Sequence, residues 1–232
     1  MDTLDAIMHE LGAVARSAAP PLGIDLPVYA EAGRDPHAPI VLGSGSLAAR
    51  VGVIGRDPGR TEVLRGEPFI GAGGRKLRDG LHRAALGGDA PDEAAAIRVG
   101  RAVFWANTVP FKPIGNKAWS VPVQRRFAPA MARLVLDLWT GSDLITCGNA
   151  AFDWIGLVEP GLAPTLAAFW ARGDRYEASL ALEVRGRPLR LHPLPHPSPL
   201  NATWYRRFPG LLDARLQALG WPDAADRALL GA

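Results

Sequence analysis

The strongest constraint on the fold is a set of short, strongly apolar runs that alternate with longer amphipathic stretches. The runs are ARVGVIG (49–55), AVFWAN (102–107) and DLITCG (143–148). Each is too short for an average helix and ends at Gly or Asn, which is typical of a buried strand. Strands that are apolar on both faces and separated by helices form parallel sheets covered on each side. We therefore predict an α/β protein with three layers, α/β/α, around a central, mainly parallel sheet of four to five strands.

The spacing of apolar residues predicts the other elements. From Thr3 they recur at helical spacing to Ser17, and Asp2 or Thr3 is expected to cap this helix. Residues 20–39, rich in Pro, Gly and Ala, are expected to form an irregular connection. The expected helices cover residues 3–17, 74–86, 120–139 and 202–219, with short helices after Asn149 and Asp223, and β-rich runs cover 176–184 and 189–191.

Composition limits the class of protein. Hydrophobic residues make up 48% and charged residues 21% of the 232 residues, so we expect one globular domain, 1–232, in which 1–48 form a helix and a lead-in. The first residues are amphipathic, and no apolar run reaches membrane-spanning length. We expect a cytoplasmic, soluble protein and, by default, a monomer. The single cysteine, Cys147, excludes an internal disulfide and a four-cysteine metal or iron–sulfur site from this chain alone. We expect no cofactor and no metal.

Polar side chains follow the predicted strands at the edge of the sheet where ligands bind in such folds. Asp57 comes directly after the first strand, where its carboxylate can orient water or stabilise a cation, although Asp-Pro-Gly is also a good turn. Asn107 ends the second strand, where its amide can read the edge of a planar base or cap its own backbone. Phe69 lies in the loop between Asp57 and a glycine-rich run, and is either a stacking surface or a core residue. The glycines match neither a dinucleotide fingerprint nor a P-loop.

The third loop reads LHPLPHPSPLNA (191–202). Its prolines lock φ and remove backbone donors, so we expect a stiff loop that is neither helix nor central strand. His196 stands between two prolines and is expected to be displayed, whereas His192 is expected to be structural. A metal site built from Asp57, His192 and His196 is an alternative, which would suit a phosphoesterase. A serine hydrolase is disfavoured because the chain has no GxSxG.

Three motifs together resemble the uracil-DNA glycosylase superfamily. They are GRDPGRTE followed by GEPFIGAGG, then NTVPFKP, then HPSPL, and the resemblance covers residues 51–208. HPSPL and NTVPFKP are similar to the general uracil-DNA glycosylases, whereas GEPFIGAGG is more similar to the iron–sulfur branch of the superfamily. That branch needs four cysteines, so we expect no cluster in this chain.

The resemblance implies a role for each matched residue in the pocket. Asp57 matches the acid that holds or activates water, and His196 matches the histidine that stabilises charge on uracil O2. Phe69 matches the ring that stacks on the flipped base, and Asn107 matches the amide that binds the uracil edge. Glu62 is the second-choice acid.

Two positions depart from the family pattern. Arg56 stands where the iron–sulfur branch has Glu. Gly59 stands where the general enzymes carry a Tyr that blocks the methyl group of thymine, so we expect a looser pocket. Gly55 and Gly59 are counted with the base-binding residues.

The resemblance also implies contacts with DNA. Ser198 matches a position that binds the DNA backbone, and Leu200 matches the residue that enters the space left by the base. Arginine carries most of the positive charge, and a basic rim around the loops would meet phosphates. Arg206, Arg207 and Lys112 are the main candidates, and the wider rim adds Arg56, Arg60, Arg65, Lys117, Arg125 and Arg126. Of Trp204 and Tyr205, one is expected in the core and one on the DNA side.

The sequence therefore predicts a monofunctional uracil-DNA glycosylase that flips uracil, with other deaminated or 5-substituted bases open, and leaves an abasic site in single- or double-stranded DNA. Two alternatives stay open at this point. The first is a protein of the same fold that binds uracil or damaged DNA with little turnover. The second is the metal-dependent phosphoesterase.

Overall fold

The computed structural model describes residues 3–18, 22–199 and 201–231. At its centre is a five-stranded sheet in the order β2-β1-β3-β5-β4. Its strands are β1 (Val51–Gly55), β2 (Phe104–Asn107), β3 (Asp143–Cys147), β4 (Leu180–Val184) and β5 (Arg187–Leu194). The pairs β1–β2, β1–β3 and β3–β5 are parallel, and β4 runs antiparallel to β5. The predicted three-layer architecture is confirmed.

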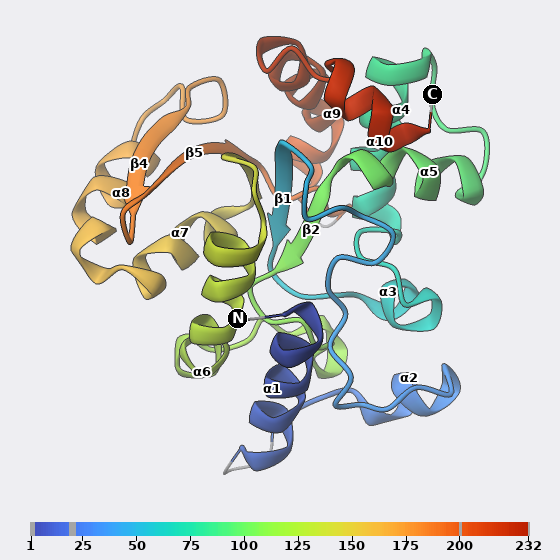
Figure 1. The fold of residues 1–232 in the computed structure, drawn as a ribbon, viewed down its shortest axis with the longest axis vertical. Coiled ribbons are helices and arrows are strands. Elements are labelled where there is room, and N and C mark those ends of the chain that lie inside the picture. Colours follow the sequence, from blue (N-terminus) through green and yellow to red (C-terminus); the bar gives the residue numbers. More distant parts are fainter. Residues whose placement is uncertain (1–2, 19–21, 200, 232) are drawn as a thin grey trace.

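The two faces of the sheet carry separate halves of the core, because successive strand residues point to opposite sides. In β1, Ile54 packs in the cluster that holds α1 (Leu4–Ser17), α6 (Val121–Ala132) and α7 (Asn149–Val158). Val53, its neighbour, packs in the cluster that holds α4 (Ala72–Leu86) and α9 (Ala202–Ala218). Figure 1 shows the same grouping of these helices on opposite sides of the strands.

The long predicted helices form where expected. In α1, Thr3 accepts a hydrogen bond from the Ala6 amide at 3.2 Å, so Thr3 is the N-cap. The helix that begins after Ser120 continues beyond α6 as a π-helical segment, Arg133–Leu138. The predicted C-terminal helix is α10 (Ala224–Leu230), which Asp223 caps. Asn149 is the first residue of α7 and not its cap, a place taken by Gly148 with φ of 85°.

Four short helices form where none was predicted, and one of them lies within residues 20–39, which were expected to be irregular. They are α2 (Leu26–Glu31), α3 (Arg60–Arg65), α5 (Glu93–Val99) and α8 (Ala163–Trp170). Helices of this length are marginal alone, so tertiary contacts decide whether they form. In α2, for example, Tyr29 is buried and its hydroxyl accepts a hydrogen bond from the Lys112 amide at 3.2 Å. Within the described residues, no helix is long and apolar enough to cross a bilayer.

The proline-rich stretch 191–202 differs from the expectation at its start. Strand β5 continues through His192 and Pro193 to Leu194, paired with β3 along that length. The other neighbour, β4, pairs with β5 only as far as Leu191. Beyond that point β5 has a partner on one side only, so a proline without an amide hydrogen is tolerated there. The stiff loop therefore begins at Pro195.

Candidate active site

A cavity of about 670 Å³ opens at the carboxyl ends of β1, β2, β3 and β5. The register places Gly55 beside Asn107 and Cys147 beside Leu194, so the loops that follow these strands leave the sheet at one edge. The chain order of the strands reverses around β1, which has β2 on one side and β3 on the other. Such a switch point is where open α/β sheets bind ligands.

The structure brings most of the predicted site residues into this cavity. Its lining includes eight of them: Gly55, Asp57, Gly59, Glu62, Phe69, Asn107, His196 and Ser198. The two prolines that flank His196 also line it, together with Cys147 and Asn116. Leu200 lies outside the described residues. Arg206, Arg207 and Lys112 are not part of the lining.

Asp57 is held by its neighbour in sequence. Its side chain is only 5% exposed, and Arg56 Nε donates to Oδ1 at 2.6 Å while Arg56 Nη2 donates to Oδ2 at 3.3 Å. Burial raises the pKa of the Asp57 carboxyl, and the Arg56 guanidinium opposes that shift. Lys112 lowers the same pKa from a greater distance, and Glu62 raises it.

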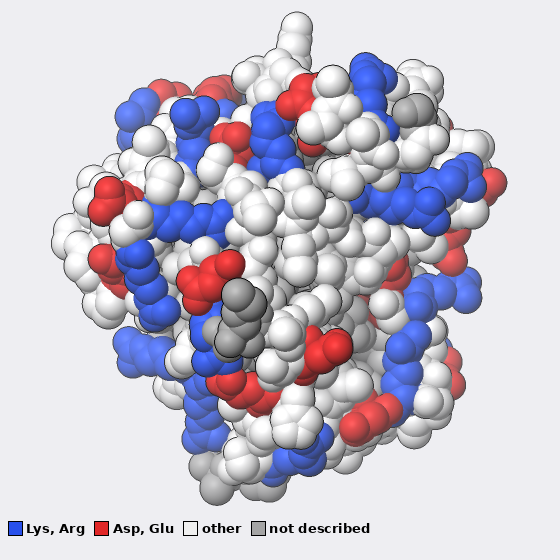
Figure 2. Space-filling model, viewed as in Figure 1, with Lys and Arg blue, Asp and Glu red and all other residues white. Residues whose placement is uncertain are grey.

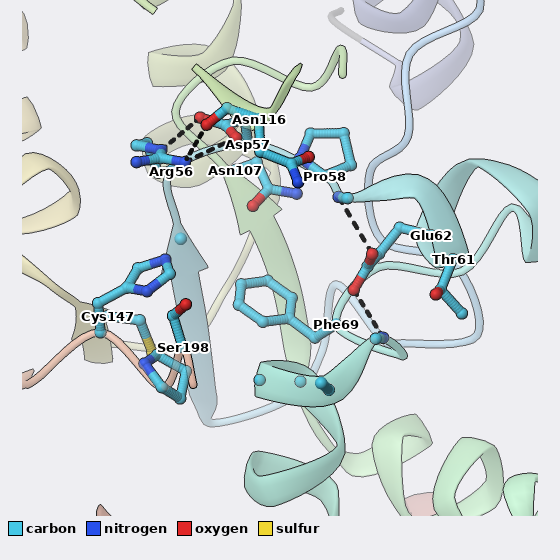
Figure 3. Close-up of a pocket in the computed structure, with 18 of the residues that line it drawn as sticks. Arg56, Asp57, Pro58, Thr61, Glu62, Phe69, Asn107, Asn116, Cys147 and Ser198 are labelled. Carbon is cyan, nitrogen blue, oxygen red and sulfur yellow. Dashed lines mark hydrogen bonds and ion pairs between the residues drawn. The ribbon is translucent and has the colours of Figure 1, made fainter. Parts of the chain in front are cut away.

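Phe69 presents a ring to the cavity from an unusual backbone conformation. Its φ is 54°, a left-handed value that a bulky residue adopts only when the surrounding structure enforces it. In Figure 3 the ring lies between Glu62 on one side and Cys147 and Ser198 on the other. Gly55 makes this placement possible, because a Cβ atom there would come within 2.7 Å of Phe69 Cζ.

The enforcing residue is Arg78 in α4, which the sequence did not single out. Its guanidinium is fully buried and donates to the carbonyl oxygens of Phe69 (2.8 Å) and Pro68 (2.7 Å). It also donates to Glu67 Oε1 at 2.6 Å, which completes a buried ion pair. Arg78 therefore fixes the loop that carries Phe69. A buried arginine on an otherwise amphipathic helix has no sequence signature that separates it from a surface arginine.

Glu62, the second-choice acid, has a clear structural task. Its two carboxylate oxygens accept the amide hydrogens of Gly59 at 3.0 Å and Gly71 at 2.7 Å. The first bond caps α3 and the second anchors the residue that precedes α4. Glu62 thus joins the Asp57 loop to the Phe69 loop (Figure 3).

Asn107 and His196 complete the polar lining. Asn107 is 3% exposed at the end of β2. Its Oδ1 lies close to Gly55, where an added Cβ atom would be 3.1 Å from that oxygen. His196 lies against Gly148, at the start of α7. Burial lowers the pKa of the His196 imidazole, and the nearby Arg56 cation lowers it further. His196 is therefore neutral at pH 7 and able to donate one hydrogen bond without carrying charge.

Cys147 and His192 are both buried, each 2% exposed. Burial raises the pKa of the Cys147 thiol to about 12, so it is neutral. His192 Nε2 lies 3.0 Å from Asp143 Oδ1, and its Nδ1 lies 2.8 Å from Ser179 Oγ, in the interface between the sheet and α9. The expected structural role of His192 is thus accounted for. In the described part of the chain, no three His, Cys, Asp or Glu side chains cluster as metal ligands would.

The three basic residues expected to contact DNA differ in exposure. Lys112 is 3% exposed, and its Nζ binds Asp25 Oδ2 at 2.8 Å and the Pro113 carbonyl at 3.0 Å. The prediction that Lys112 meets DNA phosphates is wrong, because its ammonium group is buried and already paired. Arg206 and Arg207 are exposed on the first turns of α9.

The two aromatic residues of α9 do not divide between core and surface. Trp204 and Tyr205 are both half-buried. Trp204 packs edge-on against Tyr176, with ring centroids 4.7 Å apart, and the Lys76 ammonium lies 4.1 Å from the Tyr205 ring centroid.

Fold and cavity together define an α/β protein with a pocket at the sheet edge that brings together a carboxylate, a neutral imidazole, an amide and an aromatic ring. Comparison with protein families places it further. The model of the uracil DNA glycosylase superfamily matches residues 42–220, and the chain belongs to that superfamily. No curated protein matches the chain.

Proposed function

We propose that this protein is a monofunctional DNA glycosylase that excises uracil. The observation that supports it most is the convergence of Asp57, Phe69, Asn107 and His196 on one cavity from four separate loops or strand ends. Sequence order does not require this convergence, whereas the chemistry of base excision does. A base inside a duplex is out of reach, so it must leave the stack and enter such a pocket.

Each group has a task in the reaction. The flipped uracil stacks on Phe69, and the Asn107 amide binds its edge. Water adds its oxygen to the sugar carbon as the bond from that carbon to the base nitrogen breaks, and the base leaves with the bonding electrons. The neutral His196 donates a hydrogen bond to the oxygen where negative charge develops. The Asp57 carboxylate places the water, accepts its proton and stabilises positive character on the sugar.

The position of Lys112, within the NTVPFKP motif, supports a monofunctional reaction. A glycosylase that also cleaves the strand uses an amine nucleophile in the pocket. The Lys112 ammonium is instead held by Asp25 and by a backbone carbonyl. The product is therefore an abasic site.

The test is an oligonucleotide with one uracil, in single- and double-stranded form, incubated with the protein and chelator, then treated with alkali. We expect cleavage at the uracil. Asp57→Asn and His196→Gln should each lower the rate about 10²–10³-fold, the loss typical of one preorganised electrostatic group. Arg98→Gln, an exposed change on α5, is the matched control. Binding without an abasic product would indicate a damage-recognition protein. The absence of both binding and product would refute the proposal.

The base range is set beside Gly59. No side chain stands there, and a Cβ atom would come within 2.7 Å of Glu62 Oε2. The pocket wall at this point is thus backbone and carboxylate, with no aromatic ring in between. We expect the protein to excise 5-substituted uracils or deaminated purines as well as uracil. Rates on oligonucleotides with uracil, 5-hydroxymethyluracil, hypoxanthine and xanthine measure this, and rejection of all but uracil would show that the wall is closed by other means.

A further inference from the structure

Arg56 is the first residue after β1, and its guanidinium turns back into the site. Besides the two bonds to Asp57, Nη2 donates to the Asn116 carbonyl oxygen at 3.3 Å. The Asn116 carbonyl belongs to the loop after β2, so Arg56 bridges two of the loops that form the cavity (Figure 3). The Arg56 side chain is 27% exposed, and the Asp57 side chain that it holds is 5% exposed.

The two arginines at the ends of α3, the helix that follows this loop, are arranged differently. Arg60 pairs with Glu31 of α2, and Arg65 pairs with Glu93 of α5 at 3.0 Å. Both side chains are more than half exposed. Arg60 and Arg65 have the geometry of solvated surface ion pairs, whereas the fork of Arg56 fits one carboxylate oxygen with each of two nitrogens.

We propose that Arg56 is a positioning residue that fixes the orientation of the Asp57 carboxylate and keeps it ionised for the glycosylase reaction. The inference rests on the proposed function, since it gives Asp57 the water-placing role. A bidentate pair removes the rotation of the carboxylate about its last bond, while each oxygen keeps a lone pair for water. A positioned carboxylate must also be charged to accept a proton.

The surroundings explain why Asp57 needs a cation. Burial favours the neutral acid, and Glu62 across the loop adds a second negative charge. Arg56 and, from the loop after β2, Lys112 oppose these two effects by lowering the pKa of Asp57. Burial and, after it, the Arg56 cation lower the pKa of His196, so the same cation favours an ionised Asp57 and a neutral imidazole. Loss of Arg56 leaves Lys112 to act alone.

The variants to compare are Arg56→Gln, Arg56→Lys and Arg60→Gln, with kcat/KM on uracil-containing single strands measured from pH 5 to 9. The rate requires ionised Asp57, so it falls as pH drops through the Asp57 pKa. In Arg56→Gln we expect a lower maximum of kcat/KM. We also expect the acid side of the pH profile to move to higher pH by about one unit or more, the size of shift that a neighbouring arginine produces. Arg56→Lys keeps the charge without the fork, so its maximum should fall with a smaller displacement of the acid side.

Arg60→Gln is the matched control, because it removes an arginine four residues away, at the start of α3, that pairs with Glu31 and not with Asp57. It should leave the acid side of the profile in place. An equal loss at every pH in Arg56→Gln would reduce Arg56 to a structural or phosphate-binding residue. A higher rate in Arg56→Gln would show that Arg56 blocks the Asp57 carboxylate instead of positioning it. Either result overturns the proposal.

A second measurement does not depend on activity. Titration of the Asp57 side-chain carbon by NMR should give a higher pKa in Arg56→Gln than in the unmodified protein and in Arg60→Gln. If the protein excises no uracil but this pKa still rises, the proposed function has failed and the electrostatic role of Arg56 stands. If activity is present and the pKa is unchanged, the role of Arg56 fails alone.

Discussion

At the scale of single residues, the site depends on the absence of a side chain at Gly55 as well as on the polar side chains around it. Asp57, Asn107 and His196 could be named from the sequence because their types and their places at strand ends point to chemistry. The conformation of Phe69 could not, since its positive φ arises from contacts with α4 that are distant in sequence. The pairing of Arg56 with Asp57 was likewise invisible, because adjacent residues in a loop do not fix each other's side-chain directions.

The variant Gly55→Ala tests the close approach of the Phe69 ring to the backbone at Gly55. The added methyl group would come within 2.7 Å of Phe69 Cζ and 3.1 Å of Asn107 Oδ1, so the ring must move. We expect excision of uracil to fall about 10²-fold, the order of loss for a displacement of about 1 Å at a reacting centre. Gly161→Ala, where a Cβ meets nothing within 4 Å, should keep full activity. Unchanged kinetics in Gly55→Ala would show that the Phe69 ring is not a stacking surface.

At the scale of elements, the sequence predicted the long periodic helices and the two short helices α7 and α10, and missed the short helices α2, α3, α5 and α8. Strand β5 shows a second limit, because proline density indicated a loop while pairing with β3 imposes a strand as far as Leu194. The helix α4 was predicted from its periodicity, but its buried face contains Arg78 among apolar residues. Burial of a charge depends on a partner such as Glu67, which only the tertiary structure supplies.

The Arg78–Glu67 pair predicts a stability effect in α4. Arg78→Met leaves Glu67 buried without its cation, so we expect the free energy of unfolding to fall by about 3–5 kcal/mol. The control is Arg83→Met in the same helix, which breaks partly exposed ion pairs with Asp89 and Asp213 and should cost at most about 1 kcal/mol. Urea denaturation gives both values. Similar losses in the two variants would mean that Arg78 contributes no more than a surface pair.

The contact of β3 and β5 with α9 predicts a dependence of stability on pH. Burial lowers the pKa of His192 in the folded state, whereas the unfolded chain binds a proton below about pH 6.5. Protons therefore favour the unfolded state in this window, and the free energy of unfolding should fall as pH drops from 7 to 5. Asp143, whose pKa His192 lowers, adds a loss only at more acid pH, below its ordinary value of 3.8.

The variant His192→Gln removes this proton and should flatten the slope by up to about 1.4 kcal/mol per pH unit. Exposed His9 provides the control, because His9→Gln leaves the buried network intact. The two unfolding series, at pH 7 and pH 5, are compared with the unmodified protein. An unaltered slope in His192→Gln would place the acid sensitivity elsewhere.

At the scale of the whole molecule, charge is distributed without one dominant sign. Basic and acidic side chains alternate around the edge of the face in Figure 2, in keeping with a net charge of +3. For the proposed DNA glycosylase, we therefore expect attraction to DNA to depend on exposed local cations such as Arg206 and Arg207. The sequence supplied the candidates but not their exposure, which separates Arg206 and Arg207 from the buried Lys112.

Salt dependence tests this separation. The logarithm of affinity for DNA should fall linearly with the logarithm of salt concentration, with a slope of about −0.9 per phosphate neutralised. Arg206→Gln and Arg207→Gln should each make the slope shallower by about one unit. Lys112→Met should leave the slope unchanged and lower the free energy of unfolding, because Asp25 loses its partner. A shallower slope in Lys112→Met would return that lysine to the DNA interface.

Glu62 has a consequence for how the pocket moves. One carboxylate holds the amides of Gly59 and Gly71, on the two loops that carry Asp57 and Phe69. Neither loop can move away alone without breaking the hydrogen bond that its amide donates to one oxygen of the Glu62 carboxylate. We therefore expect the loop that carries Asp57 and the loop that carries Phe69 to move together, so that a displacement of one pocket wall is accompanied by a displacement of the other.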